Sequence, residues 1–587
     1  MRKCEFRSCA RWTALAAGVA IALLLTADSV SALPKREPTA EELAGWPVDV
    51  KGHVAVKPGE HPRLLFRRTD IDRLREKAKT PEGQAMIQRL RKQLNGSDGE
   101  SMPANFVQRG ARDAADGALD TYTFSHAAGF GLLYQLTGDK KYADLGKQCM
   151  EKAFEGVMDR DTRYSFRKPS GALRSGPVLG WTALGYDLCY DGWDEAFRRK
   201  AADELQNYNE AQWMSLPELT RGERQHPGSN HWGMQVGGAA MALLAIMNDP
   251  GVDMDKINPL LETSQKSMKI NLTQGFGDGG FYVEGDGTGS MSSHIAFLTG
   301  LQAWKTAAGK DFYSPKPNAQ WTSLKWFFLT ALGGDPSNLR ASFPDRGEYP
   351  HNIWSRAGIS GGCYFGIGMG VATEEQKPAL LWFYNHSGVR EADQKGGFGT
   401  DAPGPYPHHS VVSFVNWPVG MQEKNPGEVI PHAYRDSICK FYAWRNRWQD
   451  ADDVIVSILT HATKGNMGSK AENTLTIQTG GRKSKWGTIS GGFTGEFAPK
   501  PDGSTILTTG DGSCLAIDFS GVSGAAAMLV MTGPGAPAGT VVQAGGASFS
   551  FLFPAKGGAP TPQAQGDKVA VGGQTVSLDG KKIVLAK

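Results

Sequence analysis

The sequence predicts an α+β multidomain protein, in which an N-terminal (α/α) helical toroid is followed by a C-terminal antiparallel β-sandwich. The 587 residues exceed the length of one ordinary domain, so two domains are expected. Apolar residues recur at helical spacing from Arg63 to about Gly388, in successive segments whose short connections suit antiparallel helix pairs. Near Gly396 a stretch rich in glycine and proline begins, and beyond it short segments alternate apolar and polar residues.

The first residues have the pattern of an export signal. Basic residues precede an apolar run from Ala14 to Leu25, and small residues up to Ala32 offer a cleavage site. The alternative is a membrane anchor, but the apolar run is short for a bilayer span, and no other stretch is long and apolar enough. We therefore expect a signal peptide at 1–32, a secreted or periplasmic protein, and no membrane span after signal removal.

The chain after this signal is divided by its pattern into a toroid domain at 33–395 and a sandwich domain at 396–587. Repeated helical pairs favour a toroid over a single bundle. The main helices are expected at 125–136, 142–154, 180–190, 194–214, 232–247, 257–273, 293–308, 324–332 and 374–384. Strands are expected at 411–415, 438–444, 454–459, 474–478, 514–519, 526–531 and 548–553. The pair Asp579-Gly580 predicts a hairpin turn between strands at 575–578 and 581–585.

Charge and cysteine content exclude several classes of function. The chain has 63 basic and 60 acidic residues, a balance that does not fit a nucleic-acid-binding protein. Removal of the signal leaves five scattered cysteines without a CxxC pair, so neither a disulfide framework nor a zinc ribbon is expected. Buried free cysteines are the simplest interpretation.

An amide and an imidazole open one of the predicted helices. Asn230 and His231 follow a polar, turn-rich approach and precede an apolar helix that also carries Trp232. Both side chains can donate hydrogen bonds to a carboxylate, which then accepts negative charge more easily when a proton leaves the neighbouring carbon. Elimination in a uronic-acid polysaccharide requires this step. The alternative is that Ser229 or Asn230 caps the helix and His231 packs internally.

A glycine-rich segment at 275–289 carries the next candidates. Its glycines indicate that the backbone turns tightly or approaches another part of the molecule closely, and a flexible loop tip is the alternative. Tyr282 and Glu284 lie within it, and His294 follows near the start of the next predicted helix. A phenol and an imidazole suit the base and acid of an elimination, because their pKa values can be tuned toward the working pH. We expect Tyr282 and His294 to share these roles.

Other residues are candidates for binding the substrate. Arg224 offers a two-pronged fork for a carboxylate or sulfate, and a solvated arginine or a structural ion pair is the alternative. His408 lies at the predicted domain boundary, where a cleft can form, although a surface or interface histidine is the alternative. Side chains adjacent in an extended chain point to opposite sides, so His408 and His409 make a poor metal site. The expected substrate-binding residues are Arg224, Trp232, Glu284, Tyr190 and His408.

With these residues in view, the chain resembles the heparinase II/III-like polysaccharide lyases and their alginate-lyase relatives over nearly its whole length after the signal. The resemblance is carried by residues 61–66, 134–139, 185–187, 230–231, 279–280, 284–285 and 410–415. It implies an (α/α) toroid followed by a β-sandwich, with the substrate cleft across the toroid and against the sandwich. It also implies that Asn230 and His231 act at the uronate carboxylate.

The chain departs from the family pattern at one position. Relatives place tyrosines shortly after the Glu-Gly step, whereas residues 287–291 hold none. Tyr282 or His294 takes over proton transfer, a distant tyrosine such as Tyr190 or Tyr434 reaches in, or lyase activity has been lost. The family's His-x-His pattern is also altered, to His408-His409, which weakens any inference of metal binding.

Together these features predict a secreted polysaccharide lyase that acts on an anionic, uronate-containing polysaccharide, without identifying the polymer. We expect no required cofactor, and nothing in the sequence supports a structural divalent metal. One alternative is a glycoside hydrolase on the same toroid, whose candidate carboxylates are Asp278, Glu284 and Asp286. Another is a non-catalytic glycan-binding protein, whose candidate stacking side chains are Trp181, Trp193, Trp213 and Trp232.

Overall fold

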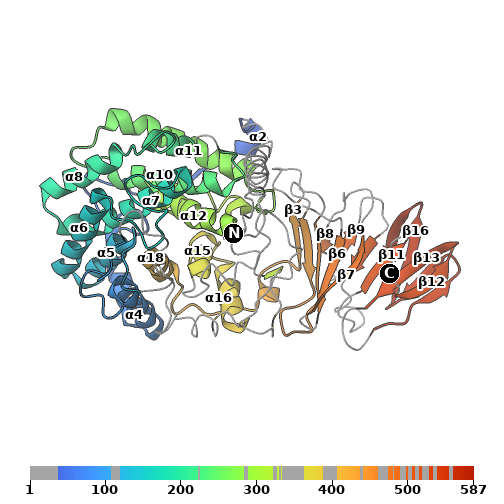
Figure 1. Ribbon diagram of the computed structural model, residues 1–587. Helices are drawn as coiled ribbons and strands as arrows, with labels where there is room; N and C mark the ends of the chain where they lie inside the picture. Colours follow the sequence, from blue (N-terminus) through green and yellow to red (C-terminus); the bar gives the residue numbers. More distant parts are fainter. Residues whose placement is uncertain are drawn as a thin grey trace, which may run out of the picture.

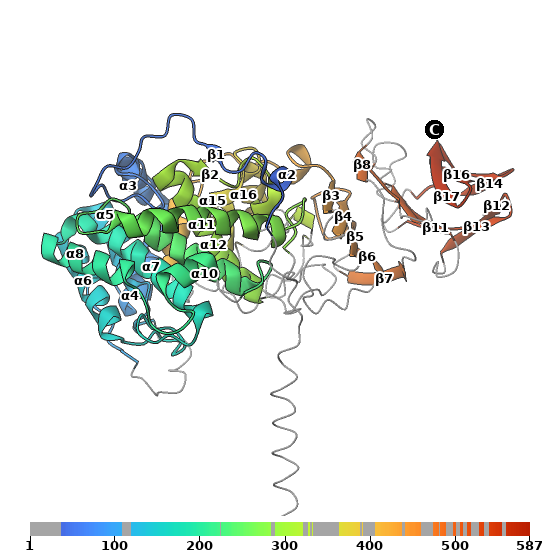
Figure 2. The same ribbon diagram turned by 90° about the horizontal axis from the view of Figure 1, so that it is seen from above.

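The computed structural model contains a helical part and a part built of strands, which lie side by side (Figures 1 and 2). It describes residues 37–107, 119–222, 225–282, 288–320, 327–328, 332, 363–387, 390, 406–436, 441–459, 474–479, 482–488, 497–499, 505–508, 514–517, 528–532, 539–553 and 559–586. The predicted signal at 1–32 lies outside these residues, as does most of the helix predicted at 324–332. The α+β fold is confirmed.

A ring of helices forms the centre of the helical part. Each of its helices contacts the next, and the last contacts the first. In ring order they are α5 (His126–Thr137), α7 (Ala172–Cys189), α10 (Asn230–Ile246), α12 (Thr288–Ala308), α15 (Cys363–Val371) and α18 (Pro407–Asn416). The helices predicted at 125–136, 180–190, 232–247 and 293–308 are confirmed, and all four belong to this ring.

Glycines let the ring helices approach closely. A Cβ added to Gly238 on α10 would lie 1.8 Å from the carbonyl oxygen of Gly176 on α7. One turn further along α7, a Cβ on Gly180 would lie 2.7 Å from the Cα of Gly238 and 3.3 Å from the Met241 sulfur. Because both contacts advance in the same direction, α7 and α10 run parallel. Larger side chains at these positions would force the two backbones apart.

Further helices surround the ring. Trp232 at the start of α10 donates through Nε1 to the carbonyl of Ser267, near the end of α11, so α10 and α11 run antiparallel. Lys77 donates to the carbonyls of Phe414, Val415 and Trp417 and so caps the C-terminal end of α18. The surrounding helices are α3 (Ile71–Lys79), α4 (Pro81–Asn95), α6 (Lys140–Glu155), α8 (Glu195–Gln206), α9 (Leu216–Arg221), α11 (Met254–Gln274) and α16 (Lys377–His386), and the short α2 (Ala40–Leu43) lies against α11.

The strand predicted at 411–415 is wrong, because these residues belong to helix α18. A short apolar run fits either period. Here Pro407 occupies the first helical turn, and His408, Val411, Val412 and Val415 follow helical spacing toward buried positions. Among the described residues, the first strand of the large sheets starts at Ala433, after α18. The domain boundary predicted at 395/396 lies outside the described residues and stays a prediction.

The helix predicted at 194–214 is shorter than expected. Asp194 caps α8 by accepting a hydrogen bond from the Phe197 N–H at 2.8 Å, and the helix ends at Gln206. A tight turn follows, in which Asn209 pairs with Ser215 and Trp213 has a φ of 72°. The polar residues between Gln206 and Ser215 break the helical pattern that the longer prediction assumed.

Antiparallel sheets follow the helices. The first has the order β3-β4-β5-β6-β7, the second β12-β13-β11-β10-β9-β8 and the third β14-β15-β16-β17, while β1 (Val48–Asp49) pairs with β2 (Lys310–Asp311). The first sheet contains β3 (Ala433–Asp436), β4 (Phe441–Arg445), β5 (Ile455–Leu459), β6 (Thr474–Thr479) and β7 (Arg482–Thr488). The second contains β8 (Phe497–Pro499), β9 (Thr505–Thr508), β10 (Cys514–Ile517), β11 (Met528–Thr532), β12 (Thr540–Ala544) and β13 (Ala547–Leu552). The third contains β14 (Gln563–Gln565), β15 (Lys568–Val571), β16 (Gln574–Asp579) and β17 (Lys582–Ala586).

Most strand predictions are confirmed. Strands lie within or beside the segments predicted at 438–444, 454–459, 474–478, 514–519, 526–531 and 548–553. The predicted hairpin turn is also found, since Asp579 pairs with Lys582 and Gly580 has a φ of 61°. The described residues contain no helix that is long and apolar enough to cross a membrane.

The boundary between the two hydrophobic clusters does not coincide with the boundary between helices and strands. Tyr434, Ala443 and Trp448, in and beside the first two strands of the first sheet, belong to the same buried cluster as the ring helices. The second and third sheets share a separate cluster that includes Phe549 and Val576. The start of the first sheet therefore packs as part of the helical body. Cys149 and Cys189 are free and buried, as predicted.

Candidate functional site

The N-terminal end of α10 carries the predicted amide and imidazole. Ser229 caps the helix, because its Oγ accepts a hydrogen bond from the His231 N–H at 3.2 Å. Asn230 is the first helical residue, and the His231 side chain is partly exposed. In the preceding turn, His226 accepts the Gly228 N–H through Nδ1 at 3.0 Å, and burial lowers the pKa of His226. Capping and the presentation of His231 therefore coexist at this helix end.

The turn before α10 is fastened to the end of α11. The Asn271 side chain donates through Nδ2 to the Pro227 carbonyl at 2.7 Å. A Cβ added to Gly275 would lie 2.9 Å from the same carbonyl oxygen. The segment with Asn230 and His231 and the start of the glycine-rich segment therefore lie against each other. The sequence singled out both segments, and the structure brings them together.

The described part of the glycine-rich segment, from Gly275 to Tyr282, folds back on itself. The Gly277 N–H donates to the Phe281 carbonyl at 2.9 Å, and Phe276 pairs with Tyr282. Asn318 holds the segment from one side by donating to the carbonyls of Leu272 and Gly277, at 3.0 and 3.1 Å. These bonds make it an ordered hairpin-like loop in place of a free tip.

The first sheet holds the other side of this loop. Asp436 on β3 accepts the N–H groups of Gly279 and Phe281 through Oδ2, at 3.0 and 2.9 Å. The Tyr434 hydroxyl donates to the Gly279 carbonyl at 2.9 Å. A Cβ on Gly277 would lie 2.0 Å from Asp436 Oδ1, and one on Gly279 would lie 2.0 Å from the carbonyl oxygen of the residue before Asp436. The prediction of a close backbone approach is confirmed, and β3 is what the loop approaches.

Charged and phenolic groups gather where the loop meets the sheet. Arg435 on β3 is exposed and stands opposite Tyr442 on β4 in the sheet register. Burial raises the pKa of Tyr442 to about 12; the Arg435 charge opposes this rise, while the charges of Asp278 and Asp436 add to it. Asp278, at the loop tip, is exposed.

Sequence reasoning missed Arg435, Asp436 and Tyr442. The run Tyr434-Arg435-Asp436 is unusually polar for the first strand of a sheet, and its alternation of buried and exposed positions is the signal that was available.

The predicted base and acid approach this region from two elements. Tyr282 is fully buried, with its ring 5.1 Å from that of Phe276. His294 lies in the first turns of α12, and its side chain is outside the described residues. A Cβ on Gly237 of α10 would lie 2.7 Å from the Phe297 Cα, so the middle of α12 packs against the middle of α10. Arg224, Glu284 and Asp286 also lie outside the described residues.

Tyr190 lies at the other end of α10. Its ring stacks on that of His61 at 3.9 Å, and His61 Nε2 contacts Asp249 at 2.9 Å, just beyond the C-terminal end of α10. The helix has 17 residues, so its two ends are separated by about 25 Å at 1.5 Å per residue. The structure therefore separates Tyr190 from Asn230, whereas Tyr434 reaches the glycine-rich loop.

Two other expected substrate-binding residues occupy packed positions. Trp232 is fully buried, since its indole faces α11. His408 is 3% exposed, and its ring stacks on that of Trp181 at 4.1 Å. The expectation of an extended chain at His408 is wrong, because the residue opens helix α18 and points into the helical core. In this structure neither side chain is accessible to a polysaccharide.

The tryptophans proposed for sugar stacking are mostly part of the core. Trp181, Trp193 and Trp232 are at most 3% exposed, and Trp213 is partly exposed in the turn after α8. Their burial does not fit a surface on which sugar rings stack. Among the described residues, no group of histidine, cysteine and acidic side chains is arranged to hold a metal ion.

No family model and no curated protein matches the sequence. Among solved structures, the chain is similar to heparinase III, with 13% identity and a TM-score of 0.37 over 90% of this chain and 80% of that chain. It is also similar to a heparan sulfate lyase of Pedobacter heparinus, with 11% identity and a TM-score of 0.42 over 88% of this chain and 93% of that chain. A chondroitin AC lyase of Streptomyces coelicolor A3 matches at 11% identity, with a TM-score of 0.36 over 87% and 75%.

The resemblance predicted from the sequence is therefore confirmed as a likeness to solved lyase structures. All three TM-scores lie below 0.5, so inferences about function rest on the residues and contacts of this chain.

Proposed function

We propose that the protein is an exported polysaccharide lyase that cleaves a uronic-acid-containing polysaccharide by β-elimination at the N-terminal end of α10. The observation that carries this proposal is the contact between the turn before Asn230 and the end of α11, formed by Asn271 and Gly275 against the Pro227 carbonyl. This contact gathers the amide, the imidazole and the glycine-rich loop at one place. The helical ring would then be the inner wall of an (α/α) toroid, with the substrate cleft running past this end toward β3.

Asn230 and His231 are assigned to the uronate carboxylate. As the C5 proton leaves, negative charge spreads onto that carboxylate, and hydrogen-bond donors there lower the barrier. The first turn of a helix adds free backbone N–H groups and the positive end of the helix dipole, which also favour an anion. The partly exposed His231 and the capped start of α10 fit this role.

Tyr282 and His294 are assigned to proton transfer. One group takes the C5 proton, and the other protonates the departing C4 oxygen, so no proton is left over. Tyr282 ends the glycine-rich hairpin and His294 lies near the start of α12, so the two come from elements on adjacent sides of α10. Tyr282 is buried in this structure, so substrate binding must open the loop edge to expose its hydroxyl.

The first sheet is assigned a positioning role. Asp436 and Tyr434 fix three backbone groups of the loop, two N–H groups and one carbonyl, without themselves reaching the substrate. The exposed Arg435 beside them suits a second acidic group of the polymer, because a guanidinium can bind a carboxylate or sulfate through two donors. The sheet thereby contributes to the site as well as to the fold.

The experiment is ultraviolet absorbance of the purified protein with a panel of uronate polysaccharides, because elimination creates an absorbing C4–C5 double bond. His231→Ala should lower the rate of absorbance rise by about 10²- to 10³-fold, the usual loss of one transition-state donor, without changing the thermal midpoint. His386→Ala is the matched control, since His386 is exposed on α16 and should leave the rate unchanged. We also expect turnover without an added cofactor and no loss of rate with a chelator.

Two outcomes would contradict the proposal. Near-normal turnover by His231→Ala would remove this histidine from the mechanism. New reducing ends without absorbance would mean hydrolysis, and the exposed Asp278 would then be the first carboxylate to replace.

A further inference from the structure

A cavity of about 820 Å³ opens at the C-terminal end of the ring helices, away from the proposed site. Gly59 lines it, and the Gly59 N–H donates to Asp249, just beyond the end of α10. Lys305, in the last turns of α12, lines it from the other side. The length of α10 puts this cavity about 25 Å from Asn230. Its volume lies within the range of small-molecule and sugar sites.

Four cationic side chains line the cavity. Lys57, Arg67, Arg68 and Lys305 contribute positive charges, and Glu60 is the acidic residue among the lining residues. Glu60, Asp191 and Asp311 pair with three of these cations, so the excess positive charge at the cavity comes from Lys57. Such an excess attracts anions through a field that a balanced surface does not have.

Two of these cations are exposed enough to meet a ligand, although Arg68 also donates to the His61 carbonyl, at 3.3 and 3.2 Å. Arg68 is 58% exposed, and its partner Asp191 is 32% exposed. Exposed pairs of this kind contribute about 0–1 kcal/mol, so a ligand anion can replace Asp191 at little cost. Lys57 is exposed, and no carboxylate among the described residues forms an ion pair with it. Arg67 and Lys305 are instead committed to Glu60 and Asp311.

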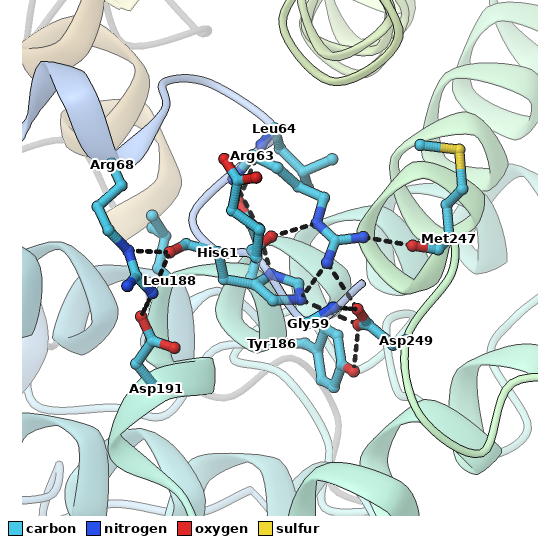
Figure 3. A network of polar contacts seen from close by, with 12 residues as sticks. Gly59, His61, Arg63, Leu64, Arg68, Tyr186, Leu188, Asp191, Met247 and Asp249 are labelled. Carbon is cyan, nitrogen blue, oxygen red and sulfur yellow. Dashed lines mark hydrogen bonds and ion pairs between the residues drawn. The ribbon is translucent and has the colours of Figure 1, made fainter. Parts of the chain in front are cut away.

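A buried network makes the cavity wall rigid (Figure 3). His61 contacts Asp187 through Nδ1 at 2.7 Å and Asp249 through Nε2 at 2.9 Å. Arg63 donates to Asp249 at 2.6 Å and to the Met247 carbonyl at 2.5 Å. These buried and partly buried bonds fix the chain that carries Lys57 and Arg68 before any ligand arrives, which lowers the entropy lost on binding.

We propose that this cavity binds an anionic sugar unit of a polysaccharide chain, as a second contact point remote from the cleavage site. Lys57 and Arg68 meet the carboxylate or sulfate of the sugar. Val54, which is 69% exposed, and Pro58 offer apolar surface to the sugar ring. A long chain bound at both places gains affinity that a short oligosaccharide cannot gain. This inference rests on the proposed function only for the choice of an anionic polysaccharide as the ligand, because binding at the cavity does not require catalysis.

The test is binding of the full-length mature protein to immobilised heparan sulfate, alginate and neutral dextran at several salt concentrations. Lys57→Glu should weaken binding to the anionic polymers on the order of fivefold, about 1 kcal/mol. Lys200→Glu is the matched control, because Lys200 is exposed on α8 and the change in net charge is the same. Weakening with both polymers indicates that a carboxylate suffices, and weakening with heparan sulfate alone indicates sulfate. Dextran should not bind.

Equal binding by Lys57→Glu and Lys200→Glu would overturn the proposal, because the effect would then follow net charge and not the cavity. Arg68→Gln should reproduce the weakening without reversing a charge, and its failure to do so would also count against the site. The absorbance assay separates this result from the proposed function. If the protein cleaves by elimination but Lys57→Glu binds polymer as well as Lys200→Glu does, the proposed function stands and the cavity site does not. If Lys57→Glu weakens binding but no elimination is seen, the cavity site stands and the proposed function does not.

Discussion

The two ends of α10 differ in which groups their hydrogen bonds hold in place. At the C-terminal end, buried side chains are bonded to one another: His61, Arg63 and Tyr186 all contact Asp249, and none is more than 4% exposed. At the N-terminal end, the bonds hold backbone groups of the loop and the turn, while the side chains of His231 and Asp278 remain partly or fully exposed. At the C-terminal end, hydrogen bonds between buried side chains stabilise the fold. At the N-terminal end, hydrogen bonds fix the backbone and leave side chains accessible to a substrate.

The largest expected effect tests the C-terminal end. Asp249→Ala removes the shared partner of His61, Arg63 and Tyr186 and leaves a buried guanidinium without its carboxylate. Breaking a buried ion pair in this way costs about 3–5 kcal/mol of the free energy of unfolding. Urea unfolding followed by circular dichroism measures the loss. Turnover of the protein that stays folded at low temperature should be close to that of the wild type.

The exposed Asp255→Ala, in the first turn of α11, is the matched control and should change the free energy of unfolding by less than about 1 kcal/mol. A loss of similar size in both variants would show that the network is not special. A folded Asp249→Ala protein without turnover would show that the two ends are coupled, which would break the comparison.

Two buried carboxyl groups, Asp159 and Asp249, differ in the direction of their pKa shifts, and this difference can be tested by varying the pH. Burial raises the pKa of Asp159 to about 7, although the N–H groups of Asp161 and Phe124 lower it. For Asp249 burial also raises the pKa, but the hydrogen bond and charge of His61 with the Arg63 charge outweigh burial and hold the pKa below its usual value. A cationic neighbour therefore decides which carboxyl group is ionised in the folded protein.

The sign for Asp159 follows from proton binding. Between about pH 4 and 7 the folded protein holds a proton on Asp159 that the unfolded chain has released, so stability falls as pH rises through this window. The rise in the pKa of Asp159 to about 7 corresponds to at most about 4 kcal/mol of the free energy of unfolding. Asp159→Asn should flatten the decline in the free energy of unfolding, measured by urea titration from pH 4 to 7.5. An unchanged slope in this variant would show that Asp159 is ionised in the folded protein.

Asp436→Ala tests the N-terminal end. It leaves the N–H groups of Gly279 and Phe281 without their acceptor. The loop should therefore pack against β3 less favourably, by about 1–3 kcal/mol of free energy. Because the loop carries Tyr282, we expect kcat to fall by tenfold or more with a small change in KM. Asp436→Asn keeps an acceptor oxygen and should recover part of kcat. Equal kcat in the wild type and Asp436→Ala would show that the sheet does not position the site.

Local features of the fold could be predicted from the sequence. The periodicity of α6 and α11, the glycine signal of the loop and the hairpin at Gly580 each depend on residues close together in the chain. The strand predicted at 411–415 is wrong because five residues, four of them apolar, are too few to define a period, and only their packing against α4, α5 and α15 makes them a helix.

The long-range contacts could not be predicted from one sequence. Asp249 is 188 residues from His61, and Asp436 is 155 residues from Phe281. The sequence carries motifs at His61 and Asp187, but nothing local in it shows that the two meet beyond the end of α10. The same limit explains Tyr190 and His408. Their residue types suit a sugar site, and only the three-dimensional arrangement puts one at the far end and the other in the core.

The smallest expected effect concerns a single hydrogen bond at the N-terminal end. Tyr434→Phe removes the bond from the hydroxyl to the Gly279 carbonyl and keeps the ring that packs 5.7 Å from Phe328. Such a bond contributes about 0.5–1.5 kcal/mol, so the thermal midpoint should fall by a few degrees at most. If Tyr434 only positions the loop, turnover falls less than in Asp436→Ala, because the two N–H bonds remain. A loss as large as that of His231→Ala, with an altered pH profile of the rate, would instead make Tyr434 the tyrosine that transfers the proton.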